Sequence, residues 1–351
     1  MEAYVLLLII ITIALLFQEN SCILNVKLGS INLDISCIFI YLVLVIFYSI
    51  RENIGYDYSM YKSIVEGGFA WSVYSRGGEF ISAFLMDVAS YHDDYHIYFF
   101  LVAVISFLFI TKSLTDNSCG KRKIAWGILV FLALPMGFIE SLSFQRQFLA
   151  IAILLYGTKY LIQKKYFKYT VVIILATMCH ASSFIYIILP IVNKFKYKWL
   201  ILGGILAAVL VNSTTSIVGE FSPRLQMYFL ATGGEFATGG ESQMALYIIL
   251  LLIGLFFKKY INSYEYDCML KIYIFSMMLI LLLSAIDLKV AIRLGAAGIY
   301  HMMFIINCWI DGIKRRQQFF AKICIYLALV GMYAYNLYVT TRNYLPFETF
   351  L

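Results

Sequence analysis

Residues 164–198 read KKYFKYTVVIILATMCHASSFIYIILPIVNKFKYK, an apolar stretch with lysines at both ends. Lysines beside short loops mark the cytoplasmic side of a membrane segment. Both ends of the apolar part, residues 169–192, can lie on that side only if the chain enters the membrane and returns. The pattern therefore predicts a re-entrant pair of half-helices that breaks around His180–Ser183. One long tilted helix, with the second lysine cluster outside, is the alternative.

The composition of the whole chain excludes a soluble protein. The 351 residues are 62% hydrophobic, 17% aromatic and 13% charged, and the mean hydropathy is +0.84. Soluble domains average about 45–50% apolar and about 25% charged residues, so a soluble fold lacks the surface to hide this excess. A water-soluble globule, a disordered tail and a nucleic-acid-binding protein are excluded. We expect a single integral membrane domain over residues 1–351.

Apolar stretches of about 20 residues, or shorter ones with adaptable flanks, predict spanning helices. Besides residues 169–192, such stretches occur at 2–17, 33–50, 96–114, 124–141, 144–162, 199–213, 244–259, 269–286, 290–310 and 320–340. Residues 79–91 are too short and carry Asp87, so we expect an interfacial helix there. The predicted fold is an all-α polytopic membrane protein with about 10–12 transmembrane helices.

The lysine clusters also predict which side of the membrane carries the functional residues. With those clusters inside, both termini and two long loops, about 51–95 and about 214–243, lie outside the cytoplasm. The inner connectors are too short for a nucleotide site, and the sequence has no P-loop motif, which excludes nucleotide-driven transport by this chain. The formal charge of +7 then divides into orienting lysines and a set of outward arginines, namely Arg51, Arg76, Arg146, Arg224, Arg293 and Arg342.

The first outer loop mixes both signs of charge with closely spaced aromatic residues: Arg51, Glu52, Tyr56, Asp57, Tyr58, Tyr61, Glu66, Trp71, Arg76 and Glu79. Aromatic faces stack on sugar rings, while carboxylates and arginines hold hydroxyls and phosphates. The alternative is an aromatic belt at the membrane surface, where Tyr and Trp collect.

Two ionisable residues near the apolar segments are candidates for chemistry. Arg146, in the turn 140–147, stands at a helix start, where the dipole disfavours a cation. That position indicates an anionic partner, although a snorkelling arginine is the alternative. His180 lies inside an apolar segment, where ionisable groups are costly and often functional. Its alternative is a packing role.

Further candidates lie in the second half of the chain. Lys289 and Arg293 are four residues apart near the start of the 290–310 helix, and like charges at that spacing repel. A phosphate between them would relieve the repulsion, and His301 is a weaker candidate in the same helix. The second outer loop contains Thr-Gly-Gly-Glu at 232–235 and 238–241, downstream of Arg224. It is either a lid over a lipid-side cavity or a plain connector.

A metal site is not expected. Residues 92–96, His-Asp-Asp-Tyr-His, place two histidines four apart beside two carboxylates, but they do not match the H-E-x-x-H pattern. The aspartates suit the N-terminus of the next helix as caps.

Three elements together resemble the EpsG/Wzy-type polysaccharide polymerase family. They are Arg51-x-x-x-Gly55-Tyr56-Asp57-Tyr58-x-x-Tyr61, then Phe144-Gln145-Arg146-Gln147-Phe148-Leu149-Ala150, and then His180-Ala181-Ser182. The motifs cover roughly residues 40–195, and the rest of the chain resembles the family by hydropathy alone. The resemblance implies a GT-C-like glycosyltransferase architecture in the bacterial inner membrane. It also implies that lipid-linked repeat units are polymerised outside the cytoplasm.

The resemblance further implies partners and residue roles. The donor is a growing glycan on undecaprenyl pyrophosphate, the acceptor is a new lipid-linked repeat unit, and no cofactor or metal is needed. Arg51, Arg146 and Arg293 are assigned to the pyrophosphate charge, and the base is expected among Asp57, Glu79 and His180. The remaining substrate contacts are assigned to Tyr56, Tyr58, Tyr61, Arg76, Gln147, Arg224 and Lys289. Membrane lipids, a chain-length regulator and a repeat-unit flippase are the expected partners.

Two other functions remain open at this point. One is a ligase that moves the glycan to a different acceptor, which is again an outer-face transferase. The other is a flippase or transporter in which the buried charges form a permeation path. Transporters often contain internal repeats, and the sequence has no convincing repeat, which counts against this class.

Overall fold

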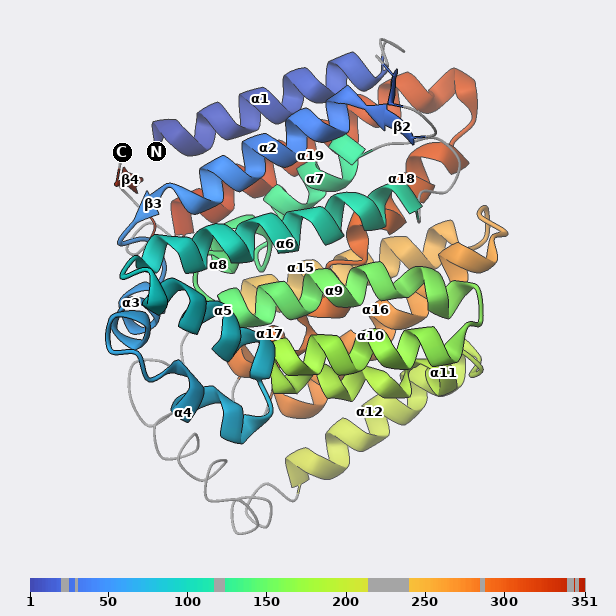
Figure 1. Cartoon of the computed structure of the whole chain (residues 1–351). Coiled ribbons are helices and arrows are strands. Elements are labelled where there is room, and N and C mark those ends of the chain that lie inside the picture. The colour runs from blue at the N-terminus through green and yellow to red at the C-terminus, as the bar shows by residue number, and fades with distance from the viewer. Residues whose placement is uncertain are drawn as a thin grey trace. The chain divides into compact units, whose positions relative to one another are not determined.

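The structure is a computed structural model of the chain and describes residues 1–19, 25–28, 31–116, 124–213, 240–284, 288–339, 344 and 347–350. It consists mainly of helices, which form two compact units. The first unit contains Met1–Tyr186 and Ile306–Leu351, and the second contains Ile187–Ile305. Figure 1 shows the course of the chain through both.

The first unit is built around three neighbouring helices, α6 (Tyr95–Asp116), α9 (Gln145–Ile162) and α10 (Tyr166–Cys179), with α9 packed against the other two. Its other helices are α1 (Glu2–Glu19), α2 (Ile35–Ser49), α3 (Tyr58–Glu66), α4 (Ala70–Tyr74), η1 (Ser75–Gly77), α5 (Phe80–Tyr91), α7 (Ile124–Ala133), α8 (Phe138–Ser141) and α19 (Arg315–Val339). Two antiparallel pairs complete the unit: β1 (Asn25–Leu28) with β2 (Ile31–Asp34), and β3 (Arg51–Glu52) with β4 (Glu348–Thr349).

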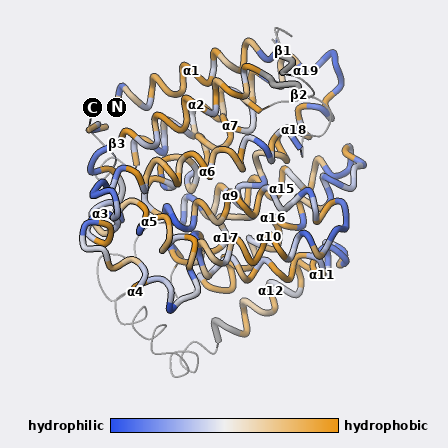
Figure 2. Tube along the Cα trace, viewed as in Figure 1, coloured by the Kyte–Doolittle hydropathy of each residue, from blue (hydrophilic) through white to orange (hydrophobic). Residues whose placement is uncertain are grey.

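Aromatic rings fill the core of the first unit. Phe131 stacks on Phe148 with ring centres 5.8 Å apart, and Tyr48 also stacks on Phe148, at 5.4 Å. Every residue of α7 is buried, because this helix passes through the middle of the packing. Figure 2 shows that the helices are mainly hydrophobic along their lengths and hydrophilic at their connections.

In the second unit α16 (Tyr264–Leu283) is central and contacts α12 (Tyr197–Ser213), α15 (Glu241–Phe257) and α17 (Leu288–Ile299). Gly295 and Gly298 bring α17 close to α16, since a Cβ at either position would meet Ile280 or Ser276. The chain enters this unit through η2 (Ala181–Ile188) and α11 (Leu189–Val192), and α18 (Met302–Gly312) crosses the unit boundary.

The chain is a helical, multi-pass membrane protein. Within the described residues α1, α6, α16 and α19 are long and apolar enough to cross a membrane, and the bent pair α17–α18 adds a fifth span if counted as one. The other apolar helices have 10–17 residues. The helices lie close to their predicted positions, while the total of about 10–12 spans stays a prediction, as do the interfacial position of α5 and the GT-C-like architecture.

Two of the predicted single helices are broken. Residues 124–141 form α7 and α8, separated by a turn at Pro135, which has no backbone N–H to continue the helix. Residues 290–310 bend by 47° between α17 and α18. There the ring nitrogen Nδ1 of His301 lies 2.9 Å from the Ala297 carbonyl, which the His301 backbone N–H would otherwise use.

The lysine-flanked segment turns back on itself. α10 ends at Cys179, and His180 is extended. The hydroxyl of Tyr169 donates to the carbonyl of Tyr186 at 2.8 Å. In a continuous helix these two residues would be about 26 Å apart at 1.5 Å per residue. The single long helix is therefore wrong and the break at His180 is confirmed, while the insertion of the pair into a membrane stays a prediction.

Candidate active site

The first long loop docks onto the turn before α9. The backbone N–H of Tyr56 donates to Ser143 Oγ at 2.8 Å, and Nη2 of Arg51 donates to the Leu142 carbonyl at 3.4 Å. Gly55 has a φ of +104°, and a Cβ at this position would collide with the same carbonyl. The R-x-x-x-G-Y-D-Y and Q-R-Q-F elements therefore form one structure, at the end of the unit where α3 and the start of α9 lie (Figure 1).

Glu79 lies at the centre of this site. It directly precedes α5, and its side chain is 8% exposed. The carboxylate oxygen Oε2 accepts a hydrogen bond from Nη1 of Arg146, the second residue of α9. The other oxygen, Oε1, lies 2.9 Å from Nδ1 of His180 and accepts from the backbone N–H of Ala181 at 3.0 Å. One carboxylate thus joins three segments that are far apart in the sequence.

These contacts keep Glu79 ionised. Burial raises the pKa of a carboxyl group. At Glu79 the hydrogen bond with His180, the charge of Arg146 and the N–H of Ala181 outweigh burial, so its pKa lies below the usual value. A carboxylate that is bound on both oxygens and has a low pKa is a weak proton acceptor. The geometry therefore favours Glu79 as the anionic partner of Arg146 rather than as the base.

His180 is positioned by the end of α10. The carbonyl of Cys179 accepts from Ser82 Oγ at 2.7 Å, which fixes the backbone just before the histidine. An ionised carboxylate can only accept, so the contact with Glu79 places the ring proton on Nδ1 and leaves Nε2 as an acceptor. The His180 side chain is 24% exposed, and within the described part of the chain Nε2 has no partner. This arrangement suits a general base.

Tyrosine rings surround Arg146. Its guanidinium carbon lies 4.0 Å from the ring centre of Tyr74 and 6.0 Å from that of Tyr61, and Tyr98 packs on Tyr61 at 5.5 Å. Nε of Arg146 and the hydroxyl of Tyr98 are buried without a hydrogen-bond partner among the described residues. Leaving a buried polar atom unpaired costs about 1–3 kcal/mol. These atoms are therefore available to oxygen atoms of a ligand or of water.

Asp57 belongs to the same neighbourhood. It is half-buried and directly precedes α3. Burial is the main cause of the raised pKa of Tyr61; the charge of Arg146 opposes this rise and that of Asp57 adds to it. The effect places the Asp57 carboxylate within electrostatic reach of Tyr61, so Asp57 remains a candidate base beside His180.

The other predicted site residues of the first unit differ in their exposure to solvent. Tyr56 is 57% exposed and Arg76 is exposed, so both are accessible, whereas Gln147 is buried. Arg51 is fully buried, with its guanidinium against the rings of Tyr48 and Phe99 and bonded to backbone carbonyls. This position favours a structural role over a contact with pyrophosphate.

The remaining candidates lie in the second unit or outside the described residues. Lys289 and Arg293 lie on α17 of the second unit, where His301 is also buried. Arg224, Arg342 and most of the glycine-rich loop at 214–243 lie outside the described residues.

A second polar cluster surrounds Glu52. Its carboxylate accepts from the hydroxyls of Tyr58 and Tyr95, both at 2.9 Å, and lies 2.8 Å from Nε2 of His96. Nδ1 of His96 lies 2.9 Å from Asp94 Oδ1, which also caps α6 by accepting from the His96 backbone N–H. Tyr58 is thus engaged in this cluster, and the predicted capping by an aspartate is confirmed. The expectation that no metal binds stays a prediction.

Sequence reasoning missed Tyr74, Tyr98 and the role of Glu52. Tyr98 lies inside an apolar helix, where a lone tyrosine gives no signal of a functional role. Tyr74 lies within the first long loop, but nothing in its sequence neighbourhood indicates a contact with Arg146. Only the folding of α4 and α6 against the start of α9 brings these rings together.

Comparison with known proteins bears on the whole chain. Residues 34–349 match the family model of the EpsG family. No curated protein and no solved structure matches the chain. The match covers the Arg51–Tyr61 element, the Arg146 element and His180 together. The chain therefore belongs to the EpsG family.

Proposed function

We propose that the chain is a glycosyltransferase that polymerises lipid-linked oligosaccharide repeat units into a surface polysaccharide. In this proposal it acts on the outer face of the bacterial inner membrane, with undecaprenyl-pyrophosphate-linked glycans as donor and acceptor. A repeat-unit flippase supplies the substrate and a chain-length regulator limits the product. Membership of the EpsG family supports a polymerase-type role, and the site geometry supports the chemistry.

One observation carries the proposed mechanism. Glu79 holds Arg146 with one oxygen and His180 with the other, and the second nitrogen of His180 stays open. His180 is the base: Nε2 takes the proton from a hydroxyl of the acceptor sugar. Glu79 is the orienting group that keeps the ring in the required tautomer, as the carboxylate does in a Ser-His-Asp triad.

The bond changes follow from this assignment. The deprotonated acceptor oxygen attacks the anomeric carbon of the donor glycan, and the bond from that carbon to the pyrophosphate oxygen breaks. The electron pair leaves with undecaprenyl pyrophosphate, and the proton remains on His180 until solvent removes it. A single displacement inverts the anomeric configuration.

Arg146 has two tasks in the proposal. It neutralises Glu79 through Nη1, and its remaining donors face the position where negative charge develops on the leaving group. The tyrosines around it exclude water and so strengthen this interaction. Arg76 and Tyr56, which are exposed near the site, contact the sugars or the phosphates.

Two other functions make different demands on these residues. A ligase that transfers the glycan to another acceptor uses the same base, so the site geometry does not distinguish it from a polymerase. A flippase forms no glycosidic bond and needs no base. The open, carboxylate-oriented nitrogen of His180 therefore favours a transferase over a transporter.

Reconstitution of the purified chain tests the proposal. Vesicles that contain the protein and undecaprenyl-pyrophosphate-linked repeat units as the sole glycan should produce lengthened, lipid-linked glycan. The Arg146→Ala variant should yield no polymer, while the exposed Arg316→Ala on α19 is the matched control and should polymerise normally. Product length is measured by gel electrophoresis and mass spectrometry.

The result separates the alternatives. Transport of the repeat units without a new glycosidic bond would contradict the polymerase. Transfer only after a second, different acceptor is added would identify a ligase. Wild-type chain lengths in Arg146→Ala would remove Arg146 from the site.

A further inference from the structure

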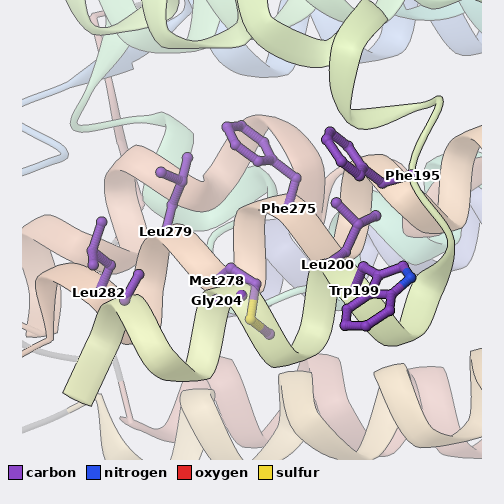
Figure 3. A pocket seen from close by; sticks show the side chains of 10 residues that line it. Phe195, Trp199, Leu200, Gly204, Phe275, Met278, Leu279 and Leu282 are labelled. Atoms are coloured by element: carbon purple, nitrogen blue, oxygen red, sulfur yellow. The ribbon is translucent and has the colours of Figure 1, made fainter. Parts of the chain in front are cut away.

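An apolar groove of about 280 Å³ runs between α12 and α16 in the second unit. Figure 3 shows Phe195, Trp199 and Phe275 toward one end, Leu282 at the other, and Met278 beside Gly204 between them. Gly204 lets the two helices approach, because a Cβ there would meet the side chain of Met278. At Gly203, which also lines the groove, a Cβ would meet open space.

Three lysines place positive charge around one end of the groove. Lys194, Lys196 and Lys198 surround the beginning of α12, are exposed, and form no ion pair within the described residues. Nζ of Lys198 lies 5.1 Å from the ring centre of Trp199, which itself lines the groove. By contrast, Lys258 and Lys271 are both paired with Asp267. An anion at the groove end would therefore meet three free cations.

The length of the groove matches one half of a bilayer. From Trp199 to Ala207 the lining residues of α12 cover about 12 Å at 1.5 Å per residue. Half of a hydrocarbon core that is about 30 Å thick is about 15 Å, which is the depth of the acyl chains of one leaflet. A tryptophan beside lysines at the start of an apolar helix is typical of the membrane–water boundary. The groove thus extends from that boundary toward the membrane centre.

We propose that the groove binds one acyl chain of an anionic phospholipid, whose phosphate contacts Lys198 and its two lysine neighbours. The apolar lining and the open space at Gly203 fit a hydrocarbon chain, and the free lysines select a negatively charged headgroup. A polyprenyl tail is much longer than a groove that matches a single leaflet. The residues that line the groove all belong to the second unit, and the proposal does not depend on the proposed polymerase activity.

Quenching of Trp199 fluorescence by brominated lipids tests the proposal. The full chain is reconstituted in phosphatidylcholine vesicles with increasing fractions of brominated phosphatidylglycerol, or of brominated phosphatidylcholine for comparison. The Trp199→Phe variant isolates the Trp199 signal from the other tryptophans. Half-maximal quenching is expected at an anionic-lipid fraction about fivefold lower than for phosphatidylcholine, because one lysine near a lipid surface contributes about 1 kcal/mol.

Two matched pairs of variants separate the groove from the charge. Gly203→Leu fills the groove and should abolish the selective quenching, while Gly331→Leu, another glycine whose Cβ meets nothing, should leave it unchanged. Lys198→Gln should lower the selectivity without abolishing it, since Lys194 and Lys196 remain, while the exposed Lys314→Gln should leave it unchanged.

The same experiment can overturn the proposal. Equal quenching by the two brominated lipids, or selective quenching that persists in Gly203→Leu, would contradict it. Displacement of the brominated lipid by polyprenyl phosphate at lower fractions than by unbrominated phosphatidylglycerol would also overturn it, since the groove would then hold the longer lipid.

Discussion

The first unit contains two glutamate–histidine pairs that look alike locally and differ in the second nitrogen of the histidine. Glu79 meets His180 at 2.9 Å, and Glu52 meets His96 at 2.8 Å. In His96 the other nitrogen also contacts a carboxylate, that of Asp94, so both contacts are filled only when both nitrogens carry a proton. In His180 the other nitrogen is open. The first-mentioned histidine, His180, is therefore the one that we propose takes up a proton, whereas both contacts of His96 suit a structural role.

The surroundings of the two glutamates support the same distinction. Glu52 is saturated by two tyrosine hydroxyls, and its histidine packs on Phe350 with ring centres 3.9 Å apart. Because β3 also pairs with β4, the Glu52 cluster joins the first long loop, residues 51–95, to the C-terminal segment. Glu79 instead shares its charge with Arg146, the cation expected to face the leaving group. The residues around each glutamate–histidine pair, rather than the pair itself, therefore distinguish the roles that we propose for Glu52 and Glu79.

Replacing the two histidines should give the largest difference between the two glutamate–histidine pairs. His180→Ala is expected to lower the polymerisation rate about 10³-fold, because general base catalysis contributes about 10²–10⁴-fold. Its Tm should fall less than that of His96→Ala, since Arg146 and the Ala181 N–H still hold Glu79. His96→Ala should do the reverse, lowering Tm and leaving most of the turnover. Turnover in vesicles and thermal unfolding in detergent are measured for both variants. An equal loss of activity in the two would contradict the assignment, and the exposed His92→Ala is the control.

Neutralising the two glutamates should give the next largest difference. Glu79→Gln keeps the shape but presents an amide that no longer fixes the His180 tautomer, so a loss of about 10²-fold in rate is expected. Glu52→Gln should change the rate less than twofold. A pH–rate profile distinguishes the two roles of Glu79. Since His180 acts as a base in its unprotonated form, a positioning role predicts that the acidic limb of the profile shifts in Glu79→Gln, while a purely structural role leaves the form of the profile unchanged. Retention of the full rate in Glu79→Gln would refute the orienting role.

The cation beside each glutamate is the third difference between the two pairs. Arg146→Lys keeps the positive charge but replaces a planar fork by a point charge that cannot hold Glu79 and a phosphate oxygen together. We expect about a tenfold lower rate, with the loss in kcat rather than in KM. Lys62→Gln, which removes the cation 3.7 Å from Glu52, should leave the rate unchanged. A wild-type kcat in Arg146→Lys would show that the fork is not required.

The sequence identifies several residues of this candidate site, but it does not show which of them contact one another. Arg146 and His180 stand out because an ionisable group in an apolar segment is costly and needs a reason. Glu79 and Asp57 lie in a charged loop, and Asp57 also belongs to the element that resembles the family, so both are candidate bases from the sequence. That Glu79 links Arg146 to His180 depends on long-range packing of α5 against the end of α10, which no local pattern encodes.

The fold shows the same division between local and long-range information. Helix positions follow from runs of apolar residues, so they were predicted closely. The bend at His301 arises from a side chain that competes for a backbone carbonyl, and hydropathy does not record such competition. The family resemblance assigns Arg51 to the pyrophosphate charge, and this assignment stays a prediction. That its guanidinium is enclosed by Tyr48 and Phe99, which come from two different helices, is a long-range packing feature that the local sequence does not record.

Acid should lower the stability contributed by both glutamate–histidine pairs, although their proposed roles differ. Burial raises the pKa of Glu52, but its bonds with His96, Tyr58 and Tyr95 outweigh burial, and the pKa of Glu79 is lowered in the same way. A carboxyl group whose pKa is lower in the folded chain adds stability above its unfolded pKa of about 4.3 and loses it as pH falls through the folded value. Tm should therefore be level near neutral pH and fall in acid.

The two glutamine variants measure how much each pair adds to that fall. Glu52→Gln and Glu79→Gln should each flatten the acid decline of Tm, recorded from about pH 7 to about pH 3 across the unfolded carboxyl pKa. Glu79 should contribute more, because its side chain is 8% exposed and that of Glu52 is 18% exposed. If both variants flatten the decline while only Glu79→Gln lowers the rate, the pairs share their electrostatics and differ in function through the open nitrogen of His180. An acid decline that is unchanged in both would show that neither carboxylate is stabilised by its histidine.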